Sequence, residues 1–417
     1  MLNRRRSDTA NDATMVRRHR RPETSGPIQL DFTGHESQQW HDIFQALADP
    51  NVTELMVNGP DNVFLTLTGH RRVRMGAKTK SGRMIGRPVS WDSIEQFEKT
   101  VTDDVEPRLT AFGSHYSEAY CIYEGGLRLK SNGKVVIRAR FHCLKPPVCE
   151  FPAVTIAKQS STLTNMDALE QSKSINGPIA DFVQAIMKHK KTIVFSGGTG
   201  AGKTTFLRSC STLINRRERV IVCEDTPELQ FETLPNTVYL MSYPKQPGVD
   251  ENSQATLSWV VAQTARMRTD RIIIGETRGP ELSDFITAAN SGFDGSMTTL
   301  HADSPTRALD KMASFIKRAP GNSFTPMSVI NSDISHAVNY IIQLGVVNNR
   351  YRLIEIDEVI PQQNSNESPI KTSKVVKYNR KTDDWDYISY PQQEEMHKEF
   401  NHIMQKYGLR MNPMADS

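Results

Sequence analysis

One glycine-rich segment near the middle of the chain constrains the fold more than any other feature. It fits the pattern G-x-x-x-x-G-K-[ST]; the apolar run 192–195 precedes it, and the run 206–209 opens a predicted helix. Strand, glycine loop and helix are the context that a phosphate-binding loop requires, because glycines let successive N–H groups turn toward a phosphate. The predicted binding residues are Ser196, Gly197, Gly198, Thr199, Gly200, Ala201, Gly202, Lys203, Thr204 and Thr205.

Two side chains of this loop carry the expected chemistry. Lys203 is placed to reach the β- and γ-phosphates of a nucleotide, and the hydroxyl of Thr204 is placed to bind Mg²⁺. The segment therefore predicts a site for a nucleoside triphosphate and Mg²⁺.

Composition indicates a soluble globular protein. The chain has 417 residues, of which 37% are hydrophobic and 24% charged, enough for two domains plus tails. No run approaches the roughly 18 apolar residues of a membrane helix. The five cysteines have no CxxC spacing, which favours reduced thiols over a zinc site or a disulfide framework.

The N-terminal segment has the most uneven charge. Residues 1–22 hold seven arginines against two aspartates, with hardly any apolar residues and no signal-peptide core. We expect residues 1–28 to form a basic, disordered extension. Two interpretations stay open: a solvated tail, or a segment that attracts anionic lipid head groups or nucleic acid.

The pattern of elements divides the remaining chain into four parts. A small α+β domain is predicted over 29–156, a polar linker over 157–178, an alternating helix–strand domain over 179–360 and a polar C-terminal extension over 361–417. The elements that define the first domain are predicted helices at 36–47 and 90–105 and predicted strands at 52–57, 63–67, 71–75, 120–123 and 134–141.

Polar residues follow three further apolar strands of the third part. Glu224 and Asp225 follow one strand, Glu276 the next and His301 the last. Each alone is more often a loop cap, but ligands bind beyond the carboxyl ends of parallel strands, so together they predict an active site. Glu276 is the candidate to orient or deprotonate the attacking water, and His301 to hydrogen-bond that water or the γ-phosphate. The alternative for His301 is a histidine satisfied within its own turn.

Gly275 departs from the usual Walker B pattern, in which an aspartate that holds Mg²⁺ precedes the glutamate. Carboxylate support for the metal must then come from elsewhere or through water. Glu224 and Asp225 are the available groups, so the predicted Mg²⁺ set is Thr204, Glu224 and Asp225.

Four segments, in this order, resemble the Walker A, Asp box, Walker B and His box of the secretion traffic ATPases. They are residues 197–205, 223–229, 266–279 and 292–304. Residues 49–59 also resemble the opening of that family's N-terminal domain, so the resemblance covers about 45–345. These proteins are the motors of type II secretion, type IV pili and type IV secretion.

The resemblance implies a RecA-like P-loop NTPase motor domain with a parallel sheet, preceded by a smaller α+β domain. It implies an enzyme that binds ATP and Mg²⁺ and couples hydrolysis to protein or nucleoprotein transport. It also implies a cytoplasmic homo-hexamer, peripherally associated with the inner membrane and its secretion-system components. Lys203 and Thr204 would bind phosphate and Mg²⁺, Glu276 would support hydrolysis and Glu224 the metal or water.

In this family the N-terminal domain also closes over the nucleotide with arginines. Arg138 and Arg140 stand two apart on a predicted strand and so share a face, about 6.6 Å apart along it. That spacing suits the grip of one polyphosphate, and a solvent-facing basic strand is the alternative. Arg278 either acts across a subunit boundary or stabilises the Walker B turn.

The Asp-box and His-box segments look more like the type IV secretion and tight-adherence pilus branches than like retraction motors. The leading hypothesis is a motor of a type IV secretion or conjugation system, with a tight-adherence pilus motor as the alternative. A nucleic-acid-dependent RecA-like motor is less favoured, because the core shows no basic stripe interleaved with aromatic residues. Direct contact with nucleic acid stays open. A subunit that binds ATP without hydrolysing it is disfavoured by the intact Lys203, Thr204, Glu224 and Glu276.

Overall fold

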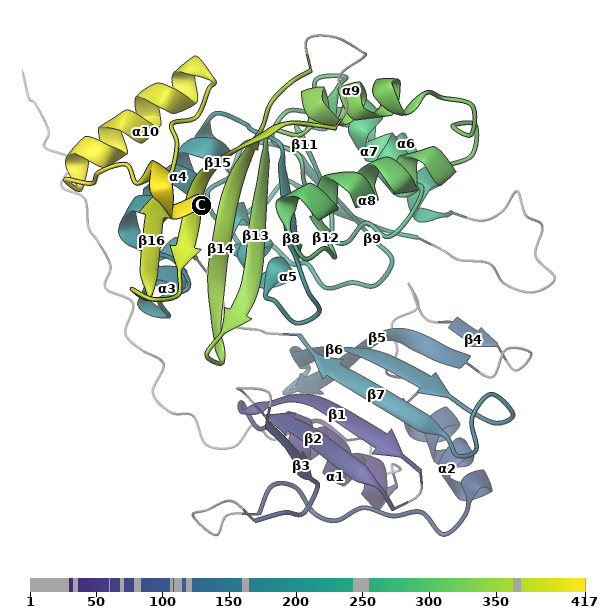
Figure 1. Ribbon diagram of the computed structural model, residues 1–417. Helices are drawn as coiled ribbons and strands as arrows, with labels where there is room; N and C mark the ends of the chain where they lie inside the picture. The colour runs from purple at the N-terminus through teal and green to yellow at the C-terminus, as the bar shows by residue number, and fades with distance from the viewer. Residues whose placement is uncertain are drawn as a thin grey trace, which may run out of the picture.

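The chain forms two sheets, each with helices of its own (Figure 1). The computed structural model describes residues 30–32, 37–59, 61–67, 71–78, 84–105, 108, 115–117, 122–159, 165–242, 255–362 and 369–416. The predicted basic extension 1–28 lies outside these residues. No helix within the described ranges is long and apolar enough to cross a membrane.

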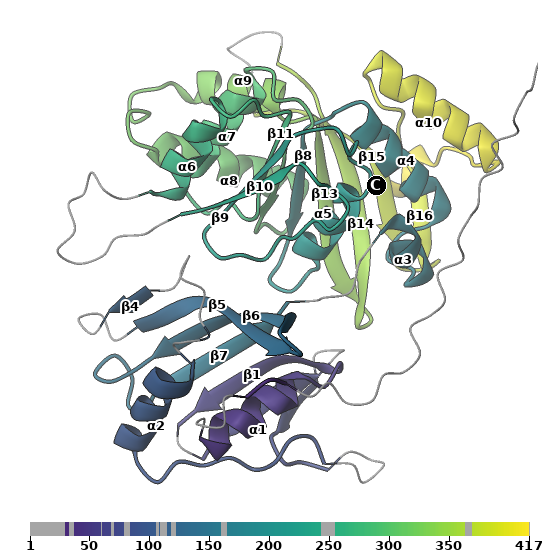
Figure 2. The same ribbon diagram turned by 180° about the vertical axis from the view of Figure 1, so that it is seen from behind.

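The front sheet has seven strands, all paired antiparallel, in the order β3-β2-β1-β7-β6-β5-β4. One face packs against two helices around a core that includes Trp40 and Phe141, and the other faces the second domain (Figures 1 and 2). The elements are α1 Gln38–Leu47, β1 Val52–Asn58, β2 Val63–Leu67, β3 Arg71–Arg74, α2 Ile94–Thr100 with a π-helical turn Val101–Val105, β4 His115–Ser117, β5 Ile122–Ser131, β6 Lys134–Leu144 and β7 Ala153–Lys158.

The alternation along β6 decides which residues reach the second sheet. Ile137, Ala139 and Phe141 are buried in the front core, whereas Arg138 and Arg140 lie on the opposite face. Two successive arginines on that face are therefore directed toward the other domain.

The second sheet has nine strands in the order β10-β9-β11-β12-β8-β13-β14-β15-β16. The first six are parallel and the last three antiparallel to their neighbours. The strands are β8 Ile193–Gly197, β9 Val220–Glu224, β10 Thr237–Met241, β11 Arg271–Ile274, β12 Met297–Leu300, β13 Tyr340–Val347, β14 Arg350–Val359, β15 Thr372–Asn379 and β16 Asp384–Tyr387.

Helices cover both faces of this sheet, which makes a three-layer α/β unit (Figure 2). Strand β8 shows why: Ile193 and Phe195 point into one core cluster and Val194 into the other. One face carries α3 Met166–Gln171, α4 Gly177–Lys188, α5 Lys203–Ser211 and α10 Glu394–Lys406; the other carries α6 Leu257–Thr264, α7 Glu281–Ala289, α8 Pro305–Arg318 and α9 Met327–Ala337. The predicted α/β architecture is confirmed.

The structure differs from the predicted domain division at two boundaries. Strand β7 continues past residue 156 and pairs with both β1 and β6, so the front sheet runs into the predicted linker. The segment 361–417, predicted as an extension, adds β15 and β16 to the second sheet. Its helix α10 packs on α4, where the rings of Phe182 and Phe400 lie 4.8 Å apart. Its polar composition hid this role because few of its residues, such as Val376 and Trp385, are buried.

Candidate nucleotide site

The phosphate loop joins β8 to α5 as the sequence predicts. Gly200 and Gly202 have φ values of +69° and +88°, a left-handed region that favours glycine, and Gly202 is the N-cap of α5. A Cβ on Gly197 would lie 2.6 Å from the backbone oxygen of Leu344, so β13 leaves room for glycine alone. Of the other predicted residues, Ser196 is the penultimate residue of β8. Gly198, Thr199 and Ala201 lie in the loop, and Thr204 and Thr205 lie in the first turn of α5.

Lys203 lies folded back into this loop. Its Nζ donates hydrogen bonds to the backbone oxygens of Gly197 and Gly198, at 3.0 and 2.9 Å, and lies 3.2 Å from Nδ1 of His301. Burial lowers the pKa of Lys203 to about 8, although the carboxylates of Glu276 and Glu228 favour its charged form. Lys203 is thus held by neutral carbonyl oxygens, which a bound phosphate would replace as its hydrogen-bond partners.

The chain of contacts continues from His301 to the Walker B glutamate. His301 Nε2 lies 2.8 Å from Oε1 of Glu276, and Arg278 donates to Oε2 of Glu276 at 2.5 Å. Burial raises the pKa of Glu276, but Arg278, His301 and Lys203 outweigh that effect and hold it below its usual value. Burial and the charge of Lys203 lower the pKa of His301. At neutral pH the site therefore holds an ionised carboxylate beside a neutral imidazole, a pair able to accept a proton from water.

Arg278 pairs with Glu276 of its own chain, and its backbone N–H donates to Glu281 at 2.5 Å. These contacts favour the interpretation that Arg278 stabilises the Walker B turn.

The structure explains why a glycine stands at position 275. A Cβ at this position would lie 2.8 Å from Oε1 of Glu224, so the side chain of Glu224 fills the space that an aspartate would need. The same oxygen accepts hydrogen bonds from the backbone N–H groups of Glu228 and Leu229, at 3.0 and 2.9 Å. Burial raises the pKa of Glu224 to about 8. Glu224 thus shapes the loop after β9, and Asp225 accepts a hydrogen bond from Ser242 at 2.6 Å.

Glu228 is the functional candidate that the sequence analysis missed. Its Oε2 accepts a 3.4 Å hydrogen bond from the hydroxyl of Thr204, and its Oε1 pairs with Arg140 of the front domain. Hydroxyl and carboxylate oxygens are ligands that Mg²⁺ accepts together with phosphate oxygens, so Thr204 and Glu228 fit such an ion. The geometry favours Glu228 over Glu224 and Asp225 at this position. Its place in the Asp-box segment, after Pro227, is the signal that could have found it.

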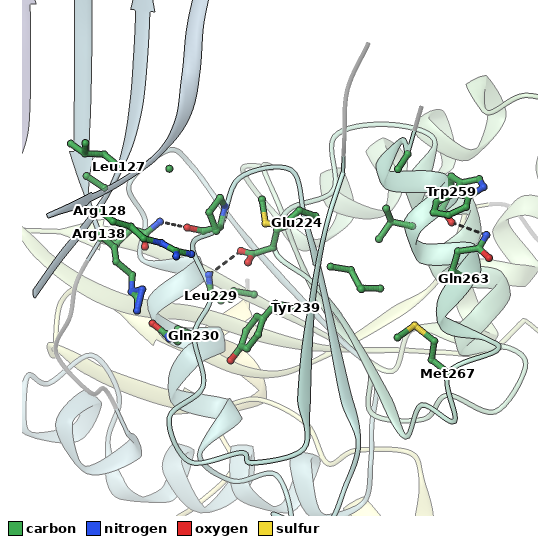
Figure 3. A pocket seen from close by; sticks show the side chains of 18 residues that line it. Leu127, Arg128, Arg138, Glu224, Leu229, Gln230, Tyr239, Trp259, Gln263 and Met267 are labelled. Atoms are coloured by element: carbon green, nitrogen blue, oxygen red, sulfur yellow. Dashed lines mark hydrogen bonds between the residues drawn. The ribbon is translucent and has the colours of Figure 1, made fainter. Parts of the chain in front are cut away.

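Arg138 and Arg140 share a face but have different surroundings. Arg140 reaches Glu228, whereas Arg138 lines a cavity of about 590 Å³ between the two domains (Figure 3). Arg128 lies directly opposite Arg138 in the β5–β6 register and lines the same cavity. Burial and the charge of Arg128 lower the pKa of Arg138. Of the two predicted arginines, Arg140 is the one linked to Thr204, through Glu228.

The front domain also contacts the second domain at another point of the loop after β9. Gln159, just after β7, donates a hydrogen bond to the backbone oxygen of Pro227. The residues between β9 and β10 are therefore the part of the second domain that contacts the front sheet on one side and Thr204 on the other.

The model of the family "Type II/IV secretion system protein" matches residues 123–376. The chain belongs to this family. The match runs from β5 of the front sheet through the phosphate loop, the loop after β9 and the ends of β11 and β12. All the contacting residues of the site described above, including Arg140, lie within the matched residues 123–376.

Two relatives from the same comparisons are secretion or conjugation proteins. The conjugal transfer protein TrbB of Rhizobium radiobacter is 27% identical over 302 residues, 72% of this chain and 81% of that protein. The type IV secretion system protein VirB11 of Brucella suis is 29% identical over 229 residues, 49% of this chain and 63% of that protein.

A solved structure supports the fold. The Legionella pneumophila ATPase DotB superposes with a TM-score of 0.54 at 15% identity, over 81% of this chain and 85% of that chain. The predicted fold, a RecA-like domain behind a smaller α+β domain, is confirmed.

Proposed function

We propose that this chain hydrolyses ATP to ADP and phosphate and uses that reaction to drive assembly of, or transport through, a type IV secretion or conjugation system. The observation that carries the proposal is the unbroken series of contacts from Lys203 through His301 to Glu276, at the carboxyl ends of β8, β12 and β11. A phosphate loop beside an ionised carboxylate suits nucleotide hydrolysis, because the loop binds the phosphates and the carboxylate can orient the attacking water.

Each residue has a role that follows from its surroundings. Lys203 leaves the carbonyls of Gly197 and Gly198 for the β- and γ-phosphates. Glu276, held ionised by Arg278, orients the attacking water and accepts its proton. His301 positions the Glu276 carboxylate on the side of the site that faces the γ-phosphate. Thr204 and Glu228 would hold Mg²⁺, which would neutralise charge on the phosphates when bound.

The front domain takes part through Arg140. Its ion pair with Glu228 links β6 to a carboxylate that also contacts Thr204. A change in nucleotide state changes the charge next to Glu228, and so changes the strength with which the front domain is held. Closure and release of that domain convert hydrolysis into rigid-body motion.

The proposal for the assembly and its location rests on the resemblance of the four motif segments to the secretion traffic ATPases. The proposed oligomer is a homo-hexamer, and the proposed partners are inner-membrane components of the secretion system. The proposed site of action is the cytoplasmic face of that membrane, with residues 1–22 in contact with anionic lipid.

The test is ATP turnover of the purified full chain beside the Lys203→Ala variant. We expect turnover in the wild type and none above background in the variant, with the thermal unfolding midpoint of both in the same range. Lys398→Ala, on the exposed face of α10, is the matched control and should keep wild-type turnover. Equal turnover in wild type and Lys203→Ala would contradict the proposal.

A second arm of the same assay adds single- or double-stranded DNA. Stimulation that is strong, salt-sensitive and retained after deletion of residues 1–26 would favour a nucleic-acid motor instead.

A further inference from the structure

The sheet order gives a bound nucleotide a direction. Glu276 and His301 follow β11 and β12, which lie on one side of β8, whereas β13 and β14 lie on the other side. If the proposed function holds, the γ-phosphate points toward Glu276. The base, at the opposite end of the nucleotide, then extends toward the β13–β14 hairpin.

The β13–β14 hairpin has a two-residue turn, and its strands pair in a defined register. Its two turn residues, Asn348 and Asn349, have φ values of +51° and +59°, as in the tight two-residue turns that match the twist of paired strands. Val346 on β13 stands directly opposite Tyr351 on β14. The hairpin extends beyond the ends of the neighbouring strands toward the front domain in both views (Figures 1 and 2).

The alternation of the strands places Val346 and Tyr351 on the α5 side of the sheet. Leu344 and Leu353, two residues away on each strand, pack in the same core cluster as Phe206 of α5. Both side chains of the pair thus face the layer in which the phosphate loop begins its helix.

The ring of Tyr351 lies against the phosphate loop itself. A Cβ on Gly202 would meet Cδ1 of this ring at 3.2 Å. The residue is nevertheless 48% exposed, and Val346 is 42% exposed. An aromatic ring and a branched aliphatic side chain therefore remain accessible beside the N-terminus of α5.

The front domain lies on the same side. The β13–β14 hairpin, which carries Tyr351, points toward the front domain (Figures 1 and 2). Closure of the front domain would thus cover whatever lies on Tyr351.

We propose that Tyr351, with Val346 beside it, is the platform on which the base of the nucleotide stacks. An aromatic face suits a purine ring, since stacking of a base on an aromatic side chain accounts for a large part of the affinity where it occurs. This proposal rests on the proposed function for the direction of the nucleotide, and it adds the residue that binds the base.

The test is equilibrium binding by calorimetry, with MgATP and with inorganic tripolyphosphate as two probes. We expect Tyr351→Ala to raise the Kd for MgATP about tenfold or more and to leave the Kd for tripolyphosphate unchanged, because only ATP has a base. Tyr351→Phe keeps the ring and should bind both probes as the wild type does. Tyr407→Ala, at the end of α10, is the matched control for loss of a partly exposed tyrosine and should also bind both normally.

The outcomes separate this proposal from the proposed function. An unchanged Kd for MgATP in a folded Tyr351→Ala would overturn the platform, and so would an equal loss of affinity for both probes. If Tyr351→Ala weakens MgATP alone but the wild type shows no turnover above Lys203→Ala, the platform stands and the proposed function fails. If Tyr351→Ala binds normally while Lys203→Ala loses turnover, the proposed function stands and the platform fails.

Discussion

Strands β8, β9, β11 and β12 of the second sheet are buried along their whole length, whereas β6 of the front sheet buries only alternate residues. In the second sheet, side-chain chemistry is therefore confined to the strand ends, where Lys203, Glu276 and His301 meet. In the front sheet it lies along a strand face, where Arg138 and Arg140 stand. The comparison teaches that the site has a fixed half, built on strand ends, and a half that a second domain brings to it.

The largest effect is expected in the fixed half. Glu276→Gln should lower turnover by about 10²- to 10⁴-fold, because the variant loses the group that accepts a proton from water. Its Kd for ATP should stay near that of the wild type, since Lys203 and the loop are intact. Turnover and calorimetric binding on the same sample check this, and normal turnover would remove Glu276 from the role.

The next effect separates the two arginines of the front sheet. Arg140→Ala should lower kcat/KM by about 10- to 100-fold, since a charge-assisted hydrogen bond contributes about 1.5–3 kcal/mol. Arg138→Ala, two residues away on the same face, should change it by less than about threefold because its side chain lines the cavity instead. Steady-state kinetics of the two variants decide the matter, and equal losses would show that the face acts as a whole.

A pH series tests the fixed half through Lys203, whose pKa burial lowers to about 8. Below that pH the lysine is charged and, in its proposed role, would bind phosphate; above it, the charge is lost. ATP affinity should therefore fall as pH rises through about 8, approaching tenfold per pH unit. Lys203→Arg keeps its charge and should give a flatter profile between pH 7 and 9.5, so parallel profiles for the two proteins would argue against this account.

The smallest effect concerns Glu224, which burial holds at a pKa of about 8 in the folded chain, above its ordinary 4.5. A raised folded-state pKa means that the protonated form stabilises the fold. This contribution is fully present below about 4.5 and is lost as pH rises through about 8. Glu224→Gln should thus flatten the decline of the thermal midpoint over that window. An unchanged decline would show that Glu224 is not the group responsible.

The strand-end residues could be predicted from the sequence because each stands at a fixed place after an apolar run. The face shared by Arg138 and Arg140 followed from the two-residue period of a strand. The Asp-box segment marks Glu228, but its contact with Thr204 could not be predicted, since that contact depends on how the buried Glu224 folds the loop after β9. The difference between the two arginines depends on the contact between domains, which no local pattern encodes.

The C-terminal strands were missed for another reason. In β15 and β16 the buried residues are apolar or aromatic side chains such as Val376 and Tyr387, and the remaining residues are polar. Composition alone therefore resembles that of a loop.

The central claim is that one nucleotide site is made by both domains, through Arg140 and Glu228 next to Thr204. The most direct measurement is a double-mutant cycle in kcat/KM with Arg140→Ala, Glu228→Gln and the double variant. We expect the double variant to be about as impaired as the worse single variant, a coupling of about 1 kcal/mol or more. Losses that multiply, with a coupling below about 0.3 kcal/mol, would contradict the claim.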